Sequence, residues 1–147
     1  MPVLKFLADT NVLSDFFRGG TPVKQWFASH RGEIALSTIT LAEIRRGIEL
    51  RPSGKRRRAL EQLYDFILED YRDAIFVFDE AAAMEWGRLA AEARNHPLPY
   101  DDSLIGAIAR SCGLKVLTRN VIHFPGCITV DPWLDQEHPA WRPTAKV

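Results

Sequence analysis

Three acidic residues are the side chains in this sequence that are best placed to do chemistry. Asp9 ends an apolar stretch near the start of the chain, Glu43 lies in a segment with helical periodicity, and Asp102 precedes another apolar segment. Carboxylates that gather at one point repel one another unless a cation holds them, and hard oxygen ligands select Mg²⁺ or Mn²⁺. The chemistry that fits is metal-assisted hydrolysis of a phosphodiester bond, because the metal activates a water and neutralises charge on the phosphate.

Each acid also has an ordinary structural interpretation. Asp9 and Asp102 precede predicted helices, and Asp is a preferred residue at a helix N-cap. Glu43 is harder to explain, because at about 100° per residue it falls among the apolar side chains of the helix predicted at 39–50. A buried ionised carboxylate costs several kcal/mol unless it is paired or binds a metal. A core salt bridge to an arginine and a metal or catalytic role therefore both stay open for Glu43.

The elements that must position these acids follow from the hydrophobic pattern. Strands are predicted at 3–8, 34–36, 74–78, 115–118 and 128–130, and helices at 12–17, 21–30, 39–50, 55–71, 79–95 and 101–112. This alternation is typical of a three-layer α/β/α fold around a central, mainly parallel sheet. Ligands in such sheets bind beyond the carboxyl ends of the strands, which is where Asp9, Ser37 and the turn at 118–120 are expected.

Length and composition indicate one globular domain. The chain has 147 residues, of which 46% are hydrophobic and 26% charged, so wholesale disorder is excluded. We assign residues 1–134 to the domain and 135–147, which contain Pro139 and Trp141, to an extended tail. No apolar run approaches the roughly 18 residues of a membrane span. Two cysteines match no disulfide framework or metal motif, which favours a reduced, cytoplasmic protein.

The charges balance overall but not locally. The sequence has 19 Lys and Arg against 19 Asp and Glu, so a uniformly basic nucleic-acid coat is excluded. The window 45–58 nevertheless holds seven basic residues and one acid, Glu49. Such a cluster suits contact with a polyanion, although a solvated helix surface is the ordinary interpretation of a charge run.

The sequence resembles the PIN-domain ribonucleases, specifically the VapC and FitB-like toxins of bacterial toxin–antitoxin pairs. The matching stretches, in the order of the family, are LADTNVLSDFFRG, STITLAEIRRGIELRPSGKRRRALEQL, LPYDDSLIGAIARSCGLKVLTRNVIHFPG and VDPW. Together they span most of residues 4–134. The stretch RPSGKRR makes the FitB-like branch the nearest match.

The resemblance implies a PIN-like fold and an endoribonuclease that depends on Mg²⁺ or Mn²⁺. By position, Asp9, Glu43 and Asp102 match the family's catalytic acids, and Asp9 and Asp102 its metal ligands. Asp102 is chosen over Asp101 because the family's Asp stands three residues before Ile-x-Ala. Three further matches, with supporting or substrate-positioning roles, are Asn11, Thr118 and Asn120.

The resemblance also implies partners for the chain. These are an RNA substrate, a cognate antitoxin that is a small DNA-binding protein, and a second copy of the chain in a homodimer. No membrane contact is implied, and the expected location is the cytoplasm.

One position departs from the family pattern. Where the family often reads Thr-Arg-Asn-x-x-Asp-Phe, this chain has His123 in place of the late acid. The alternative is therefore a catalytically weak or inactive PIN module that binds an RNA or protein partner. A dehalogenase-like phosphatase fits less well because Asn11 stands where that class needs a second Asp. A receiver domain leaves Glu43 unexplained, and the four histidines lack the ligand spacing of a zinc site.

Overall fold

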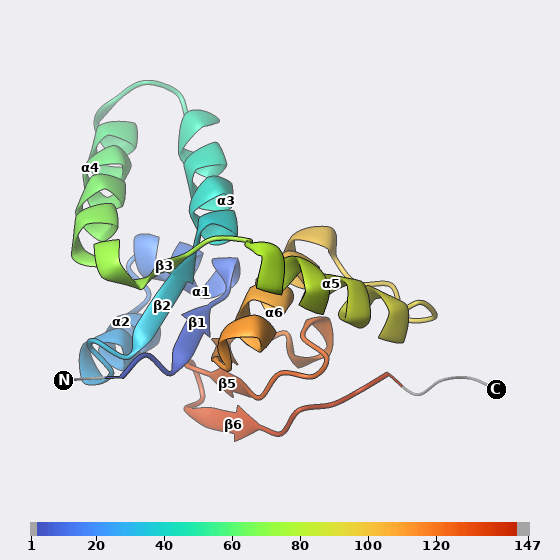
Figure 1. Ribbon diagram of the computed structural model, residues 1–147. Helices are drawn as coiled ribbons and strands as arrows, with labels where there is room; N and C mark the ends of the chain where they lie inside the picture. The colour runs from blue at the N-terminus through green and yellow to red at the C-terminus, as the bar shows by residue number, and fades with distance from the viewer. Residues whose placement is uncertain (1–2, 144–147) are drawn as a thin grey trace.

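The computed structural model describes residues 3–143 (Figure 1). The strands are β1 (Phe6–Ala8), β2 (Ile34–Ser37), β3 (Ile75–Phe76), β4 (Lys115–Leu117), β5 (Thr129–Asp131) and β6 (Gln136–His138). The helices are α1 (Thr10–Phe17), α2 (Thr21–Ser29), α3 (Thr38–Glu49), α4 (Lys55–Asp70), α5 (Glu80–Glu92) and α6 (Tyr100–Cys112). Two short 3₁₀ turns, η1 (Arg72–Ala74) and η2 (Val121–His123), complete the described part of the chain.

The strands of the described chain form one sheet in the order β3-β2-β1-β4-β5-β6. All neighbouring pairs are parallel except β5 and β6, which are antiparallel. In the central strand, Leu7 pairs with Ala35 on one side and Val116 on the other. The prediction of a central, mainly parallel sheet is therefore confirmed.

Helices cover both faces of the sheet, and alternate residues of β1 show the two layers. Phe6 and Ala8 pack into a cluster with side chains of α1, α2, α3 and α4. Leu7 points to the opposite face and packs with Ile105 and Ile108 of α6. Because side chains of a strand alternate between its faces, this short buried strand contributes to two cores at once. The three-layer α/β/α architecture is thereby confirmed.

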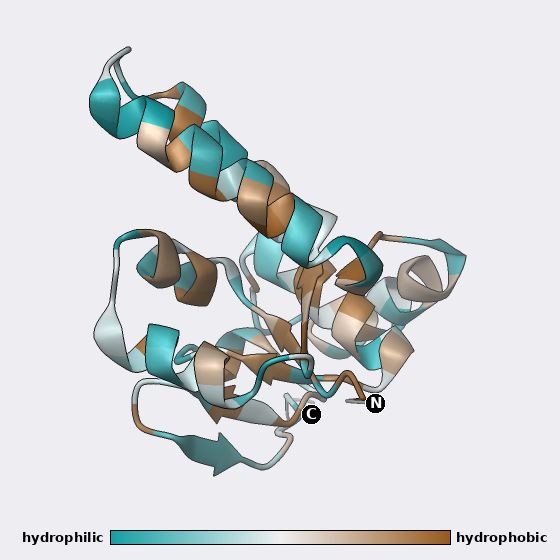
Figure 2. Cartoon of the chain, turned by 90° about the vertical axis from the view of Figure 1, so that its left-hand side faces the viewer, coloured by the Kyte–Doolittle hydropathy of each residue, from teal (hydrophilic) through white to brown (hydrophobic). Residues whose placement is uncertain are grey.

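The helices α3 and α4 form a hairpin that rises from the body of the molecule (Figures 1 and 2). The far end of this hairpin is hydrophilic (Figure 2). The chain reverses there at Gly54, whose φ of 154° is favoured only for glycine. Figure 1 shows that the remaining two helices, α5 and α6, pack together on the other side of the molecule.

Capping residues set several helix ends. The side chain of Ser37 accepts a hydrogen bond from the Thr40 N–H at the start of α3, and that of Asp79 accepts one from Ala82 at the start of α5. Gly113 ends α6 in the left-handed conformation, with φ of 67°. At α6 the structure differs from the prediction, because Pro99 is the N-cap and Asp102 lies inside the first turn.

Within residues 135–143, the chain contributes the strand β6 to the sheet. The sequence prediction missed β6 because Gln136–His138 is a polar segment without hydrophobic alternation. Its backbone pairs with β5, which no local pattern reveals. Further along, the Trp141 indole N–H donates to the Val121 carbonyl at 2.8 Å, so this part of the segment also contacts the body.

Within residues 3–143, no helix is both long enough and apolar enough to span a membrane.

Candidate active site

The site begins with Asp9, at the point where β1 ends. The Asp9 backbone N–H donates to the carbonyl of Leu117 in β4, which fixes the residue between the two central strands. Its side chain is only 1% exposed. Thr118, directly after β4, donates its hydroxyl to Asp9 Oδ2 at 2.9 Å. The other oxygen, Oδ1, is buried and has no hydrogen-bond partner among the described residues.

Thr118 links Asp9 to the turn that follows β4. While its hydroxyl donates to Asp9, its Oγ1 accepts a hydrogen bond from the Asn120 backbone N–H at 2.9 Å. Asn11 lines the same pocket but is exposed. Among the described residues it makes no hydrogen bond to Asp9, so the contact that holds Asp9 comes from Thr118.

Glu43 reaches the site from α3. Its Oε1 accepts a hydrogen bond of 2.6 Å from the hydroxyl of Thr10, which begins α1. Within the part of the chain that the structure describes, Glu43 makes no ion pair with a basic residue. The interpretation as a core salt bridge is therefore wrong, and Glu43 is half-buried beside the pocket rather than in the core.

The first turn of α6 supplies two more acids. Asp102 is half-buried, and its Oδ2 lies 2.8 Å from Nδ1 of His123 in η2. Asp101 is exposed at the rim of the pocket. The departure from the family pattern at His123 thus has a structural counterpart, because this side chain contacts one of the predicted site acids directly.

The environment disfavours negative charge on these acids. Burial, and after it the charge of Asp102, raise the pKa of Asp9 from 3.8 to about 6, while the hydrogen bond from Thr118 opposes the shift. Burial also raises the pKa of Glu43, against the hydrogen bond from Thr10, with a further rise from the charge of Asp101. For Asp102, burial raises the pKa and the contact with His123 lowers it. A bound cation would relieve this repulsion.

These acids line one open pocket of about 390 Å³. Its lining is Asp9, Thr10, Asn11, Glu43, Pro99, Tyr100, Asp101, Asp102, Asn120 and His123. No three Asp, Glu, His or Cys side chains in the described chain stand close enough to hold an ion together. Mg²⁺ typically takes only one or two protein carboxylates and completes its shell with waters and substrate phosphate. The unpartnered Oδ1 of Asp9 and the all-oxygen donor set fit such an ion.

Thr10 and Asp101 line this pocket and are not among the site residues predicted from the sequence. Thr10 lay within the quoted stretch LADTNVLSDFFRG, but nothing local indicated that its hydroxyl would reach Glu43 on another helix. Asp101 was set aside in favour of its neighbour Asp102, and the structure places both at the pocket.

Comparisons with known proteins agree with this fold. The PIN domain family matches residues 6–123. Plasmid stability protein StbB of Pseudomonas syringae pv. tomato is 36% identical over 135 residues, covering 86% of this chain and 97% of that protein. Toxin FitB of Neisseria gonorrhoeae is 34% identical over 137 residues, covering 88% and 99%. VapC ribonuclease Y4jK of Sinorhizobium fredii is 31% identical over 133 residues, covering 85% and 95%.

Solved structures are similar over the same length. The crystal structure of FitAcB from Neisseria gonorrhoeae matches with a TM-score of 0.80 and 32% identity, covering 87% of this chain and 98% of that chain. The structure of FitAB bound to an IR36 DNA fragment matches with a TM-score of 0.81 and 30% identity, covering 87% and 95%. With the family match over most of the chain and these relatives over nearly all of it, this chain belongs to the PIN domain family.

Proposed function

We propose that this chain is a metal-dependent endoribonuclease and the toxin of a bacterial toxin–antitoxin pair. The observation that carries the proposal is the buried Asp9 carboxylate, with one unpartnered oxygen, in a pocket that also contains Glu43 and Asp102. The family membership and the relatives named as toxins and ribonucleases support the same reaction. A metal held by such carboxylates would support hydrolysis of a phosphodiester bond.

In this proposal, Asp9 and Asp102 hold Mg²⁺ or Mn²⁺. When bound, the metal lowers the pKa of a water and neutralises charge on the phosphate. Thr118 bonds Asp9 Oδ2 and so leaves Oδ1 free for a ligand. Thr10 bonds Glu43 Oε1, and the other oxygen of Glu43 accepts a proton from the attacking water. Its raised pKa suits that role, because a general base works best with a pKa near the operating pH.

The remaining polar residues position the substrate. Asn120 lines the pocket beside Asp9 and is held by Thr118, so its amide is placed to donate to a phosphate oxygen. His123 orients Asp102 through their 2.8 Å contact. This chain then acts in the bacterial cytoplasm, where RNA is available.

The proposal includes a protein partner. Among the relatives are a toxin and a plasmid stability protein, and one similar solved structure is that of FitAB bound to a DNA fragment. We therefore propose a cognate antitoxin, a small DNA-binding protein that silences the nuclease, and a homodimer of this chain. Co-expression with the product of the adjacent reading frame should restore growth to cells that express this chain.

The test of the reaction is RNA cleavage by the purified chain with and without EDTA. Cleavage should stop in EDTA and return with excess Mg²⁺ or Mn²⁺, and Asp9→Asn should be inactive under all conditions. Cleavage that survives EDTA would refute metal dependence. RNA that is bound but never cut would favour the non-catalytic PIN module, to which the His123 substitution points.

A further inference from the structure

We propose that the groove between α1, α3 and the start of α4 binds the RNA backbone next to the cleavage site, through Arg18, Arg51 and Arg56. The inference rests on the proposed function and names the residues that hold the substrate outside the acidic pocket. They are positioning residues, because they touch phosphates that do not react.

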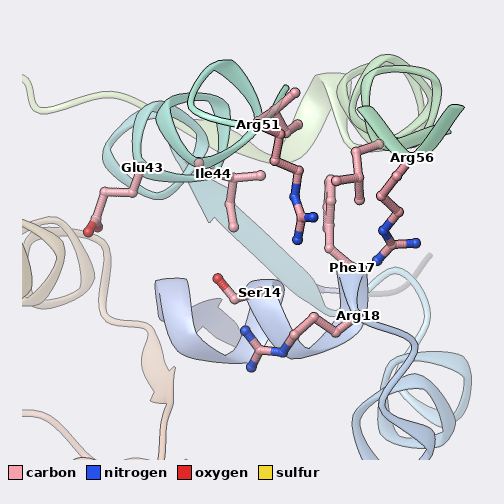
Figure 3. A pocket seen from close by; sticks show the side chains of 10 residues that line it. Ser14, Phe17, Arg18, Glu43, Ile44, Arg51 and Arg56 are labelled. Carbon is pink, nitrogen blue, oxygen red and sulfur yellow. The ribbon is translucent and has the colours of Figure 1, made fainter. Parts of the chain in front are cut away.

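The groove has an open volume of about 190 Å³ and adjoins the acidic pocket. Glu43 lines both, so the groove and the acidic pocket share this residue. In Figure 3 the side chains of Arg51 and Arg56 extend from above toward α1, and Arg18 lies below them near Ser14. Glu43 is at the other end of the groove and points away from the arginines (Figure 3). The acidic side chain therefore lies at one end of the groove and the three arginines lie toward the other.

The basic residues of the window 45–58 differ in their ion pairing and in the surface that they line. Arg45 and Arg57 are committed to ion pairs with Glu49, at 2.6 and 2.8 Å. Arg51 and Arg56 make no ion pair with any acid among the described residues, and both line the groove. These two arginines are therefore available to a ligand in the groove.

Arg18 completes the set from the opposite wall. It is the C-cap of α1, and its exposed guanidinium lies 3.8 Å from the half-buried carboxylate of Asp15. An ion pair of this length with an exposed cation contributes little. Like charges that share one groove repel, and an anion between them removes that repulsion. Guanidinium groups also match phosphate oxygens in a bidentate geometry.

The turn between α3 and α4 explains why two arginines of one segment face the groove together. Arg51 follows α3, Arg56 lies in the first turn of α4, and the chain reverses between them at Gly54. Since Gly54 has φ of 154°, a residue with a side chain would strain this reversal. The hairpin therefore holds the two guanidinium groups on one side.

Charge and position together favour RNA as the occupant. The reacting phosphodiester must lie in the acidic pocket, and the adjacent phosphates of the same strand need cationic partners along its path. The groove that shares Glu43 provides three. Its floor also contains apolar side chains, among them Ile44 and Ile48, so a protein segment is the competing occupant that the experiment must separate.

The first experiment measures binding without cleavage. In the Asp9→Asn background, the double variant Arg51→Ala/Arg56→Ala is titrated with a fluorescein-labelled single-stranded RNA oligonucleotide at several NaCl concentrations. Each lost phosphate contact should reduce the slope of log K against log salt by about 0.7, so the pair should reduce it by about 1.4. The control Arg46→Ala/Arg58→Ala removes two exposed charges of the same hairpin that do not line the groove. Its slope should change less.

The second experiment measures cleavage with Asp9 intact. The Arg51→Ala/Arg56→Ala variant should raise KM about tenfold with kcat unchanged, because the lost contacts are the same in the ground and transition states. Its circular dichroism spectrum and Tm should match those of the parent chain. A general loss of structure would instead lower kcat and Tm together.

The outcomes separate this inference from the proposed function. If the double variant has the KM and salt slope of the parent, and the parent cleaves RNA, the groove inference is wrong and the proposed nuclease activity is unaffected. If the salt slope depends on the two arginines but the parent cleaves no RNA, the groove inference holds and the proposed nuclease activity is wrong. If the double variant keeps its RNA slope but no longer binds a co-expressed antitoxin, the groove binds protein and the inference is wrong.

Discussion

At the scale of single residues, Asp9 is a carboxylate in an environment that disfavours its negative charge. Its carboxylate is buried next to Asp102, and one of its two oxygens has no hydrogen-bond partner in the described chain. Such a group destabilises the folded state when it is ionised. The metal-binding role that we propose for Asp9 would explain why a carboxylate occupies a position that itself favours a neutral side chain.

We predict that Asp9→Asn stabilises the metal-free fold increasingly as pH rises. Well below pH 3.8, Asp9 is protonated in both the folded and the unfolded chain. Between pH 4 and 6 the unfolded chain ionises first, because the folded pKa is about 6 against an ordinary 3.8. The parent therefore loses stability over this window, by about 3 kcal/mol at roughly 1.4 kcal/mol per pKa unit, and the variant does not.

Urea unfolding in EDTA at pH 4 and pH 7 measures this difference. Asp65→Asn, which removes an exposed carboxylate of α4, is the control for the loss of one charge. A stability difference between Asp9→Asn and parent that stays constant with pH would contradict the prediction.

His123 is the second residue whose chemistry can be tested directly. Its imidazole contacts Asp102 at 2.8 Å where the family often has an acid. We predict that His123→Asp tightens Mg²⁺ binding, measured by titration calorimetry, and raises cleavage at low Mg²⁺, because the pocket gains a hard oxygen ligand. His123→Asn, similar in size but neutral, should not. Equal Mg²⁺ affinity in parent and His123→Asp would exclude this position from the metal site.

At the scale of elements, capping side chains decide where the helices begin. Asp79 accepts the Ala82 N–H at the start of α5, which packs on α6. We predict that Asp79→Ala lowers the free energy of unfolding by about 1 kcal/mol and leaves RNA cleavage unchanged. Asp79→Asn should retain most of the stability, because asparagine is an equally good N-cap. Equal losses in both variants, by urea denaturation, would assign the effect to charge instead of capping.

At the scale of the whole molecule, the segment after residue 134 connects distant parts of the fold. Trp141 donates its indole N–H to Val121, accepts the Gly126 N–H at its carbonyl, and packs edge-on against His96 at 5.0 Å. Val121 begins η2, the turn that carries His123. The contacts of this segment therefore reach an element of the candidate site.

We predict that Trp141→Ala lowers the free energy of unfolding by about 2 kcal/mol, because it removes both packing and a hydrogen bond. Trp141→Phe keeps the aromatic packing and should lose about 1 kcal/mol. A chain that ends at residue 134 lacks β6 as well and should be the least stable. Equal Tm values for that chain and the full chain would show that the domain ends at 134.

The sequence alone determined most of the elements and the candidates for chemistry. Strands and helices follow from hydrophobic periodicity, and the ends of α3, α5 and α6 follow from Ser37, Asp79 and Gly113. These signals are readable because each depends on residues a few positions apart. The same local patterns placed Asp9 beyond a strand and singled out Glu43 as a carboxylate that a core would not tolerate.

Only the tertiary structure decided which of these residues meet. Thr10 bonds Glu43, 33 residues away in the sequence, and Thr118 bonds Asp9, 109 residues away. The strand β6, the contact of His123 with Asp102, and the division of the basic window into paired and free arginines are equally invisible in local patterns. Such contacts are set by the register of parallel strands and by how helices pack across them, and that packing is decided by the summed burial of the whole core.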